Sequence, residues 1–336
     1  MKQEIGKNPD YRKTAAVTGL LLVIIILFSI FAGNDALKAS DAWKVLTGSG
    51  SATHQMILFR IRLPRVLAAV AAGAALAVAG FLLQSCLNNV LASPGIVGIN
   101  SGAGLFVLLS GLLFPYMAGM KCFMAFAGAL LAAGMVYLVS FRIGMSKSSV
   151  ILVGVAISGL CSSGIDVIIS LKPETVADKA AFHLGGFAAL NLSAVQFSVP
   201  VIAITLGMAS ILAPGLDVIM LGDETASGLG LDVRLYRGAS IVCAALLAAA
   251  AVSMSGLLGF VGLIVPNFLR LFYRGKSRNI IGLCIMGGAA FLLLCDTLAR
   301  LLVFPYELPC GLLLSGIGTP FFMWLLIEKR KRIGNV

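Results

Sequence analysis

The sequence is short of charged residues. Asp, Glu, Lys and Arg make up only 12% of its 336 residues, whereas hydrophobic residues make up 59%. Soluble globular domains carry about a quarter of their residues as charged side chains, so this composition excludes an ordinary soluble protein. Most of the chain must face an apolar solvent, and that solvent is the hydrocarbon core of a membrane.

The residues that build metal sites and disulfide frameworks are also sparse. The seven cysteines are scattered with no Cys-x-x-Cys pair, and the only two histidines, His54 and His183, lie far apart. This spacing predicts free thiols and no metal site. A phosphate-binding loop is excluded because Gly275-Lys276-Ser277 has Arg270 where that motif needs its first glycine. We therefore expect no catalytic residue, no cofactor and no nucleotide-hydrolysing site in this chain.

Long apolar runs dominate the rest of the sequence. Most come close to the roughly 20 residues that a helix needs to cross a membrane, and they lack the alternating pattern of transmembrane β-strands. The sequence predicts an all-α integral membrane protein, one transmembrane domain over residues 1–336. We expect about ten spans, the first retained rather than cleaved as a signal peptide: residues 15–33, 66–84, 96–114, 120–141, 148–171, 195–213, 238–256, 257–273, 280–298 and 309–327.

The distribution of positive charge predicts how the spans are oriented. The net charge is +11, but Lys and Arg collect between apolar runs and at both ends of the chain, which argues against a nucleic-acid partner. With ten spans both termini lie on one side, and sixteen of the 25 basic residues fall on that side. Cytoplasmic loops are enriched in basic residues, so we expect both termini in the cytoplasm.

Three arginines depart from this rule. Arg60, Arg62 and Arg65 stand at the start of the second predicted span, on the side that the rule assigns to the outside. One interpretation is a functional contact with an external partner. The other is that long side chains at a helix end extend to the lipid headgroups.

Acidic residues inside the spans are few. Asp296 precedes Arg300 by four residues, the spacing of an ion pair on one helix face. Asp166 is the isolated acid, toward the outer half of its predicted helix. Ion-coupled secondary transporters place ionisable groups within the membrane. These two residues weaken that function but leave it open as an alternative.

The loop between the sixth and seventh spans, residues 214–237, is long enough to contain short helices. It combines charged and apolar residues, and the predicted topology places it in the cytoplasm. Asp223 or Glu224 is suited to cap a helix start by accepting backbone N–H groups. Loops of this length are often functional, and the alternative is a capped connector without a partner.

Two arginine-containing stretches open spans of opposite orientation. Arg62-Leu63-Pro64-Arg65 precedes the Ala-rich second span, and Arg234-Leu235-Tyr236-Arg237 precedes the Ala-rich seventh. Runs of small residues in membrane helices mark helix–helix contact. The match of the two stretches is short, and it favours an inverted repeat of the kind found in transporters.

Further motifs follow in order between residues 60 and 327. They are Arg62-Leu63-Pro64-Arg65, Gly73-Ala74-Ala75-Leu76-Ala77, Gly80, Gln84, residues 88–94, Gly98-Ile99 with Ser101-Gly102-Ala103, the 221–230 loop, Gly259–Pro266, Gly288-Ala289, Asp296 with Arg300, Glu307–Gly311 and Gly318–Phe322. Together they resemble the FecCD-type permeases of ATP-binding-cassette (ABC) importers. Two positions depart from the family pattern: Val90 replaces a proline, and Asn267 replaces a histidine.

The resemblance implies the FecCD-type permease fold and three kinds of partner. A second permease subunit, identical or a paralogue, would complete the translocation path. A cytoplasmic ABC ATPase dimer would bind ATP and Mg²⁺, and a substrate-binding protein would dock outside. The implied location is the bacterial inner membrane, and the implied cargo is an iron–siderophore chelate, with haem or cobalamin as the alternative.

The resemblance also implies roles for individual residues. Arg62, Arg65 and Arg300 match the positions that meet acidic residues of the binding protein. The ATPase-coupling positions match Leu221, Gly222, Asp223, Glu224, Ala226, Leu229 and Gly230.

Overall fold

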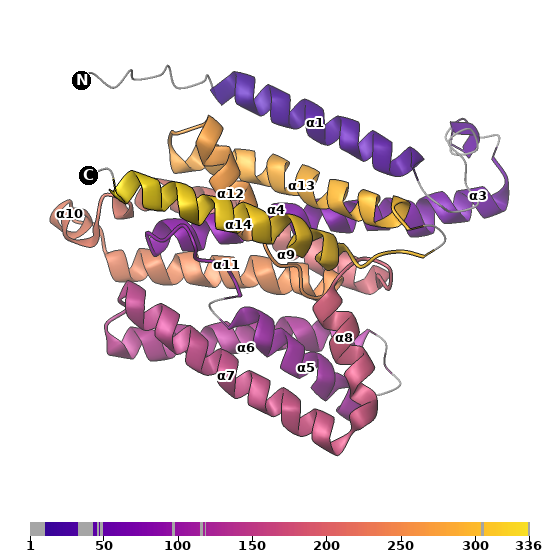
Figure 1. Ribbon diagram of the computed structural model, residues 1–336, viewed down its shortest axis with the longest axis horizontal. Helices are drawn as coiled ribbons and strands as arrows, with labels where there is room; N and C mark the ends of the chain where they lie inside the picture. Colours follow the sequence, from indigo (N-terminus) through magenta and orange to yellow (C-terminus); the bar gives the residue numbers. More distant parts are fainter. Residues whose placement is uncertain are drawn as a thin grey trace.

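The computed structural model describes residues 11–32, 43–45, 47, 50–95, 98–114, 117, 119–303 and 306–334. Over these ranges the secondary structure is helical and contains no strand, which confirms the predicted all-α fold (Figure 1). Lys2 and Lys7, which contribute to the predicted topology, lie outside the described residues.

Seven helices in the described ranges are long and apolar enough to cross a membrane. They are α1 (Tyr11–Phe31), the continuous run of α3 (Ala52–Met56), η1 (Ile57–Arg62) and α4 (Leu63–Cys86), α6 (Met120–Ile143), α7 (Lys147–Leu171), α9 (Leu192–Ile219), α11 (Val233–Ser255) and α13 (Ser277–Leu301). Three further helices have shorter apolar stretches: α5 (Ile99–Leu113), α12 (Val261–Phe272) and α14 (Cys310–Gly334). Each of these ten helices overlaps one of the ten predicted spans.

The shortest of these ten helices is α12. Its 12 residues rise only about 18 Å, less than the roughly 30 Å of a hydrocarbon core. The expectation of a full span at 257–273 is therefore wrong. The preceding helix ends at Ser255, and the chain turns through Gly256–Phe260 before α12 begins.

Helices α4 and α11 form the centre of the bundle, and α1 lies at its edge against α13 (Figure 1). Close approach at the centre depends on glycine. A side chain at Gly80 of α4 would collide with the carbonyl of Gly262 in α12, and one at Gly73 would collide with Gly288 in α13. Small residues thus lie at helix–helix contacts, as the sequence predicts.

The order long helix, short helix, long helix occurs twice, as α4–α5–α6 and as α11–α12–α13. Each short helix follows a residue with positive φ, Gly98 (76°) before α5 and Phe260 (67°) before α12. The start of α11 lies beside the end of α4, because Arg237 contacts Cys86, so these two helices run in opposite directions. This arrangement agrees with an inverted repeat.

The predicted loop at 214–237 is shorter in the structure. Helix α9 continues through Pro214 to Ile219, and α11 begins at Val233. The connection contains one short helix, α10 (Asp223–Gly228), which projects from one end of the bundle (Figure 1). We refer to this as the α10 end. The opposite end, where α4 begins at Arg62 and Arg65, is the arginine end.

The long connection after α7 lies at the arginine end. It contains η2 (Pro173–Thr175) and α8 (Val176–Leu184). The amide of Leu257 donates to the carbonyl of Phe182, and the amide of Gly186 donates to that of Ser255. This connection is therefore hydrogen-bonded through its backbone to the turn between α11 and α12.

Candidate functional sites at the two ends of the bundle

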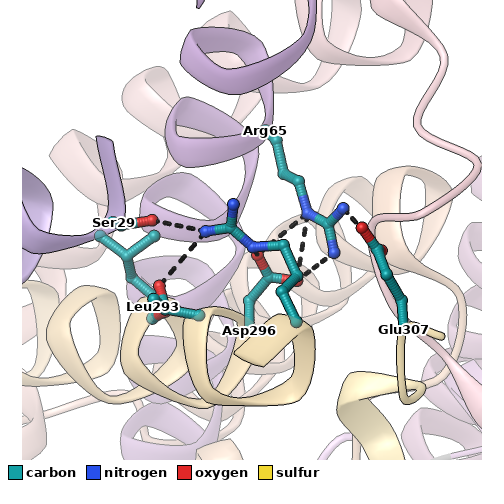
Figure 2. Close-up of polar contacts among 7 residues, drawn as sticks. Ser29, Arg65, Leu293, Asp296 and Glu307 are labelled. Carbon is teal, nitrogen blue, oxygen red and sulfur yellow. Dashed lines mark hydrogen bonds and ion pairs between the residues drawn. The ribbon is translucent and has the colours of Figure 1, made fainter. Parts of the chain in front are cut away.

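The arginine end contains a buried ion-pair network centred on Asp296 of α13. The Nε and Nη2 atoms of Arg65 donate to its carboxylate at 3.0 and 2.9 Å. The third nitrogen of Arg65, Nη1, donates to Glu307 at 2.9 Å. Figure 2 shows the Arg65 guanidinium lying between the two carboxylates. The Asp296 side chain is 1% exposed and that of Glu307 is 37% exposed, so the network reaches the surface through Glu307.

Two further arginines at this end contact α1. Arg62 is buried and donates from Nη1 to the carbonyl of Ile30 at 2.8 Å. Arg300 donates from Nη2 to Ser29 Oγ at 2.9 Å, and its Nε lies 3.5 Å from the Asp296 carboxylate. The expected contact between Asp296 and Arg300 is therefore present. Arg65 is nevertheless the closer partner of Asp296, and spacing along one helix cannot reveal it.

The structure thus brings together the three arginines assigned to docking. Arg62 and Arg300 are buried, and the Arg65 side chain is 11% exposed. Of these three, Arg65 is the most exposed, and it is bonded to the accessible carboxylate of Glu307. The remaining arginine of the cluster, Arg60, is exposed. Glu307 is the second partner of Arg65. In the sequence it stands out only as part of the Glu307–Gly311 motif, and nothing there indicates a contact with Arg65.

The α10 end is organised around Arg237 of α11. Its Nη2 donates to both carboxylate oxygens of Asp223 at 2.9 Å, and Lys147 Nζ lies 3.4 Å from the same carboxylate. Partial burial works to raise the pKa of Asp223, but the bonds to Arg237 and the charge of Lys147 outweigh it and lower that pKa below its ordinary value. Asp223 is therefore ionised at neutral pH.

The first turn of α10 differs from the expected cap. The residue before the helix is Gly222, which has a φ of 116° and offers no side-chain cap, while Asp223 turns to Arg237 instead. The expectation that Asp223 or Glu224 caps the helix is wrong. Both acids nevertheless occupy the first turn, where the helix dipole favours negative charge.

The outer surface of α10 is open and partly apolar. Leu221 and Leu229 are 65% and 67% exposed, whereas Ala226 is buried against the bundle. Glu224 is exposed, and Gly230 ends the segment with a φ of 84°. Beside α10 lies a hollow of about 500 Å³, lined by Ser146, Lys147, Ser148 and residues 221–225. All seven predicted coupling residues thus lie on or beside one short projecting helix.

Helix α7 carries a polar strip on an exposed face. The strip consists of Gly159, Ser162, Ser163, Asp166 and Ser170. The Asp166 side chain is 72% exposed and lies 3.5 Å from Lys179 of α8. A carboxylate on a membrane helix is favourable where it faces protein or water rather than lipid.

Comparison with known proteins places the chain among transport permeases. The profile of the FecCD transport family matches residues 21–328. The iron(3+)-hydroxamate import permease FhuG of Bacillus subtilis is 33% identical over 93% of this chain and 96% of its own length. The hemin transport permease HmuU of Yersinia pestis is 34% identical over 93% and 95%. The vitamin B12 import permease BtuC of Vibrio cholerae is 34% identical over 94% of each chain.

A solved structure has the same fold. It is an inward-facing metal-chelate type ABC transporter, 27% identical, with a TM-score of 0.82 over 95% of this chain and 100% of that one. Both the sequence match and the fold extend over nearly the whole length. The chain therefore belongs to the FecCD transport family and is a multi-pass permease of the ABC-importer type.

Proposed function

We propose that this chain is the permease subunit of an importer that moves an iron(III) chelate across the bacterial inner membrane. A binding protein delivers the chelate outside, and two cytoplasmic ATPase subunits hydrolyse ATP. Two permease subunits, identical or paralogous, form the path. The chain supplies the membrane domain, since its sequence contains no phosphate-binding loop.

The observation that carries this proposal is the projecting helix α10. A short helix with two exposed leucines and an exposed acid, held outside the membrane spans beside a polar hollow, suits a protein partner better than lipid. We assign this surface to the ATPase. The α10 end is then cytoplasmic. So are the start of α1, where Tyr11 packs against Tyr273, and the end of α14, which lies at the same end of the bundle (Figure 1).

The polar face of α7 supports the two-subunit path. In a single chain, Asp166 and three serines would face acyl chains, which is unfavourable. A second permease subunit opposite α7 would enclose this face and give it water. Asp166 lies near Lys179, and Asp296 is bound by Arg65, so neither resembles an isolated proton or sodium carrier. This disfavours the ion-coupled alternative.

The binding protein is assigned to the arginine end. Arg65 lies at the edge of its network, with Glu307 as its accessible carboxylate partner. An acidic side chain of the binding protein can take the place of Glu307 on Arg65. Charge complementarity of this kind gives fast encounter and fixes orientation. Arg300 shares the Asp296 carboxylate with Arg65, and Arg62 holds the start of α4 against α1.

The relatives identify the cargo less clearly than they identify the family. Permeases named for ferric hydroxamate, hemin and vitamin B12 are equally similar to this chain, at 33–34% identity. We choose an iron(III) chelate because two permeases named for Fe(3+)-citrate are also 34–35% identical to this chain and the solved relative is of the metal-chelate type. Haem and cobalamin are the alternatives to be tested beside it.

The proposal is tested in proteoliposomes that contain the permease with its ATPase and binding protein. Uptake of a ⁵⁵Fe-labelled siderophore should require internal ATP and the binding protein, and should exceed uptake of haem and cobalamin. Reversal of both acids, D223K/E224K, should abolish uptake while the complex still inserts. ATP-independent uptake driven by an ion gradient would overturn the proposal, and preference for haem or cobalamin would overturn the choice of cargo.

A further inference from the structure

Arg237 is more deeply enclosed than a charged residue near a membrane surface needs to be. Its side chain is 3% exposed although it lies in the second turn of α11, next to the aqueous connection that contains α10. Buried cations persist only when they are paired and their N–H groups are used. Besides Asp223, Arg237 has two backbone acceptors, and these belong to two other segments.

The first backbone acceptor is the end of α4. Arg237 Nε donates to the carbonyl of Cys86, the last residue of that helix, at 3.0 Å. The carbonyls in the last turn of a helix have no N–H donor within the helix. A cation placed there can donate to them and also interacts favourably with the helix dipole. Arg237 therefore acts as a C-terminal cap for α4 supplied by a residue 151 positions away.

The second backbone acceptor is the turn that leads into α7. Arg237 Nη1 donates to the carbonyl of Met145 at 2.8 Å. Met145 has a φ of 55° and a fully buried side chain. A long side chain rarely adopts this left-handed conformation, and such residues persist where several contacts fix them. The bond from Arg237 is one of these contacts, so the entry to α7 depends on it.

We propose that Arg237 is a positioning residue that joins α10, the end of α4 and the start of α7 into one rigid unit. This inference rests on the proposed function of α10. When the ATPases move α10, the unit carries α4 and α7 with it, and α7 bears the polar face assigned to the path. Only a guanidinium provides three directions of N–H donation in one plane, so lysine cannot replace it.

The first test compares R237K with the matched control R234K in the reconstituted importer. Arg234 is exposed and lies one turn earlier on the same helix. R237K should keep basal ATPase activity within about twofold of wild type, while transport per ATP falls at least tenfold. R234K should behave as wild type. Equal transport per ATP in the two variants would overturn the role of Arg237.

A double-mutant cycle guards against a variant that fails to fold. D223N removes the ionised acceptor and leaves Arg237 bonded to Cys86 and Met145. If the contacts act as a unit, D223N should also lower transport per ATP, and D223N/R237K should be no worse than R237K alone. Additive losses would contradict a single rigid unit.

A distance measurement separates positioning from simple stabilisation. Spin labels at Ser227 of α10 and Ser148 of α7, both exposed, report the spacing of the two helices. Wild type should keep one distance with and without ATP, whereas R237K should change or broaden it when ATP binds. A distance that changes equally in both would refute the rigid unit. If D223K/E224K also leaves transport intact, the assignment of α10 itself has failed.

Discussion

At the scale of single residues, Asp296 balances the charge of the arginine end. It is almost fully buried and accepts hydrogen bonds from two nitrogens of Arg65, with Arg300 close by. Removing one partner of a buried ion pair costs more than the pair contributes, because the other charge stays buried. The two arginines would then lie in a low-dielectric site without their shared carboxylate.

We therefore expect D296N to lower the free energy of unfolding by about 3–5 kcal/mol. The measurement is thermal or denaturant unfolding of the purified permease in detergent. D166N is the matched control, because Asp166 is 72% exposed and its ion pair with Lys179 is long. Similar stability of the two variants would show that Asp296 does not organise this end.

Glu307 provides the test of docking at the arginine end. If Arg65 meets an acidic residue of the binding protein, Glu307 competes for the same guanidinium group. E307Q should therefore tighten docking by up to about fivefold, since a partly exposed pair is worth about 0.2–1 kcal/mol. Affinity is measured on the permease–ATPase complex in nanodiscs. E174Q makes the same charge change at another exposed site and should have no effect; an unchanged E307Q would remove Arg65 from the docking surface.

The residues of the candidate sites could be predicted from the sequence, but the side chains that contact one another within each site could not. The arginines, Asp296 and the coupling residues all stand out by position or resemblance. Their contacts join residues such as Arg65 and Asp296, which are 231 positions apart, and no local spacing encodes such a pair. Helical spacing favoured Arg300 as the partner of Asp296, and three-dimensional packing made Arg65 the closer one.

At the scale of helices, α4 depends on the absence of side chains at two positions. Gly80 meets the Gly262 backbone and Gly73 meets the Gly288 backbone. Without a hydrophobic force between helices in lipid, close backbone packing is a main source of their association. A methyl group at either position must push two helices apart.

G80A should consequently destabilise the protein by about 1–3 kcal/mol, although alanine is the better helix former. G134A in α6 is the control, because a side chain there meets no atom within 4 Å. G134A should leave stability unchanged or raise it slightly. The check is the unfolding temperature of both variants in the same detergent; a melting temperature of G80A at or above wild type would contradict the packing role.

Span positions were the most predictable part of the fold, since hydropathy follows directly from the apolar solvent. Boundaries were less so where a helix continues beyond its apolar core. The predicted span ends at residue 213, but α9 continues to Ile219. Residues 52–62, including the π-helical turn of η1, extend α4 by two further segments before the predicted start of the span at residue 66.

At the scale of the whole molecule, orientation is the remaining prediction. Single cysteines at Glu174 and Ser227 occupy exposed positions in connections on opposite sides of the predicted topology. A membrane-impermeant maleimide applied to intact cells should label E174C and spare S227C. Native thiols give little background, because six of the seven cysteines are buried and Cys122 is half-buried. Labelling of S227C but not of E174C would show that the chain has the opposite orientation in the membrane.

The pairing of Arg65 with Asp296 has a consequence for biosynthesis. The ribosome makes α4 long before α13, so the nascent helix must enter the membrane while the carboxylate that neutralises Arg65 does not yet exist. Until then its arginines are best accommodated among lipid headgroups, where their charge is solvated. We therefore expect α4 to insert with Arg65 still unpaired with Asp296, and this ion pair to form only when α13 (Ser277–Leu301), close to the end of the 336-residue sequence, has inserted beside it.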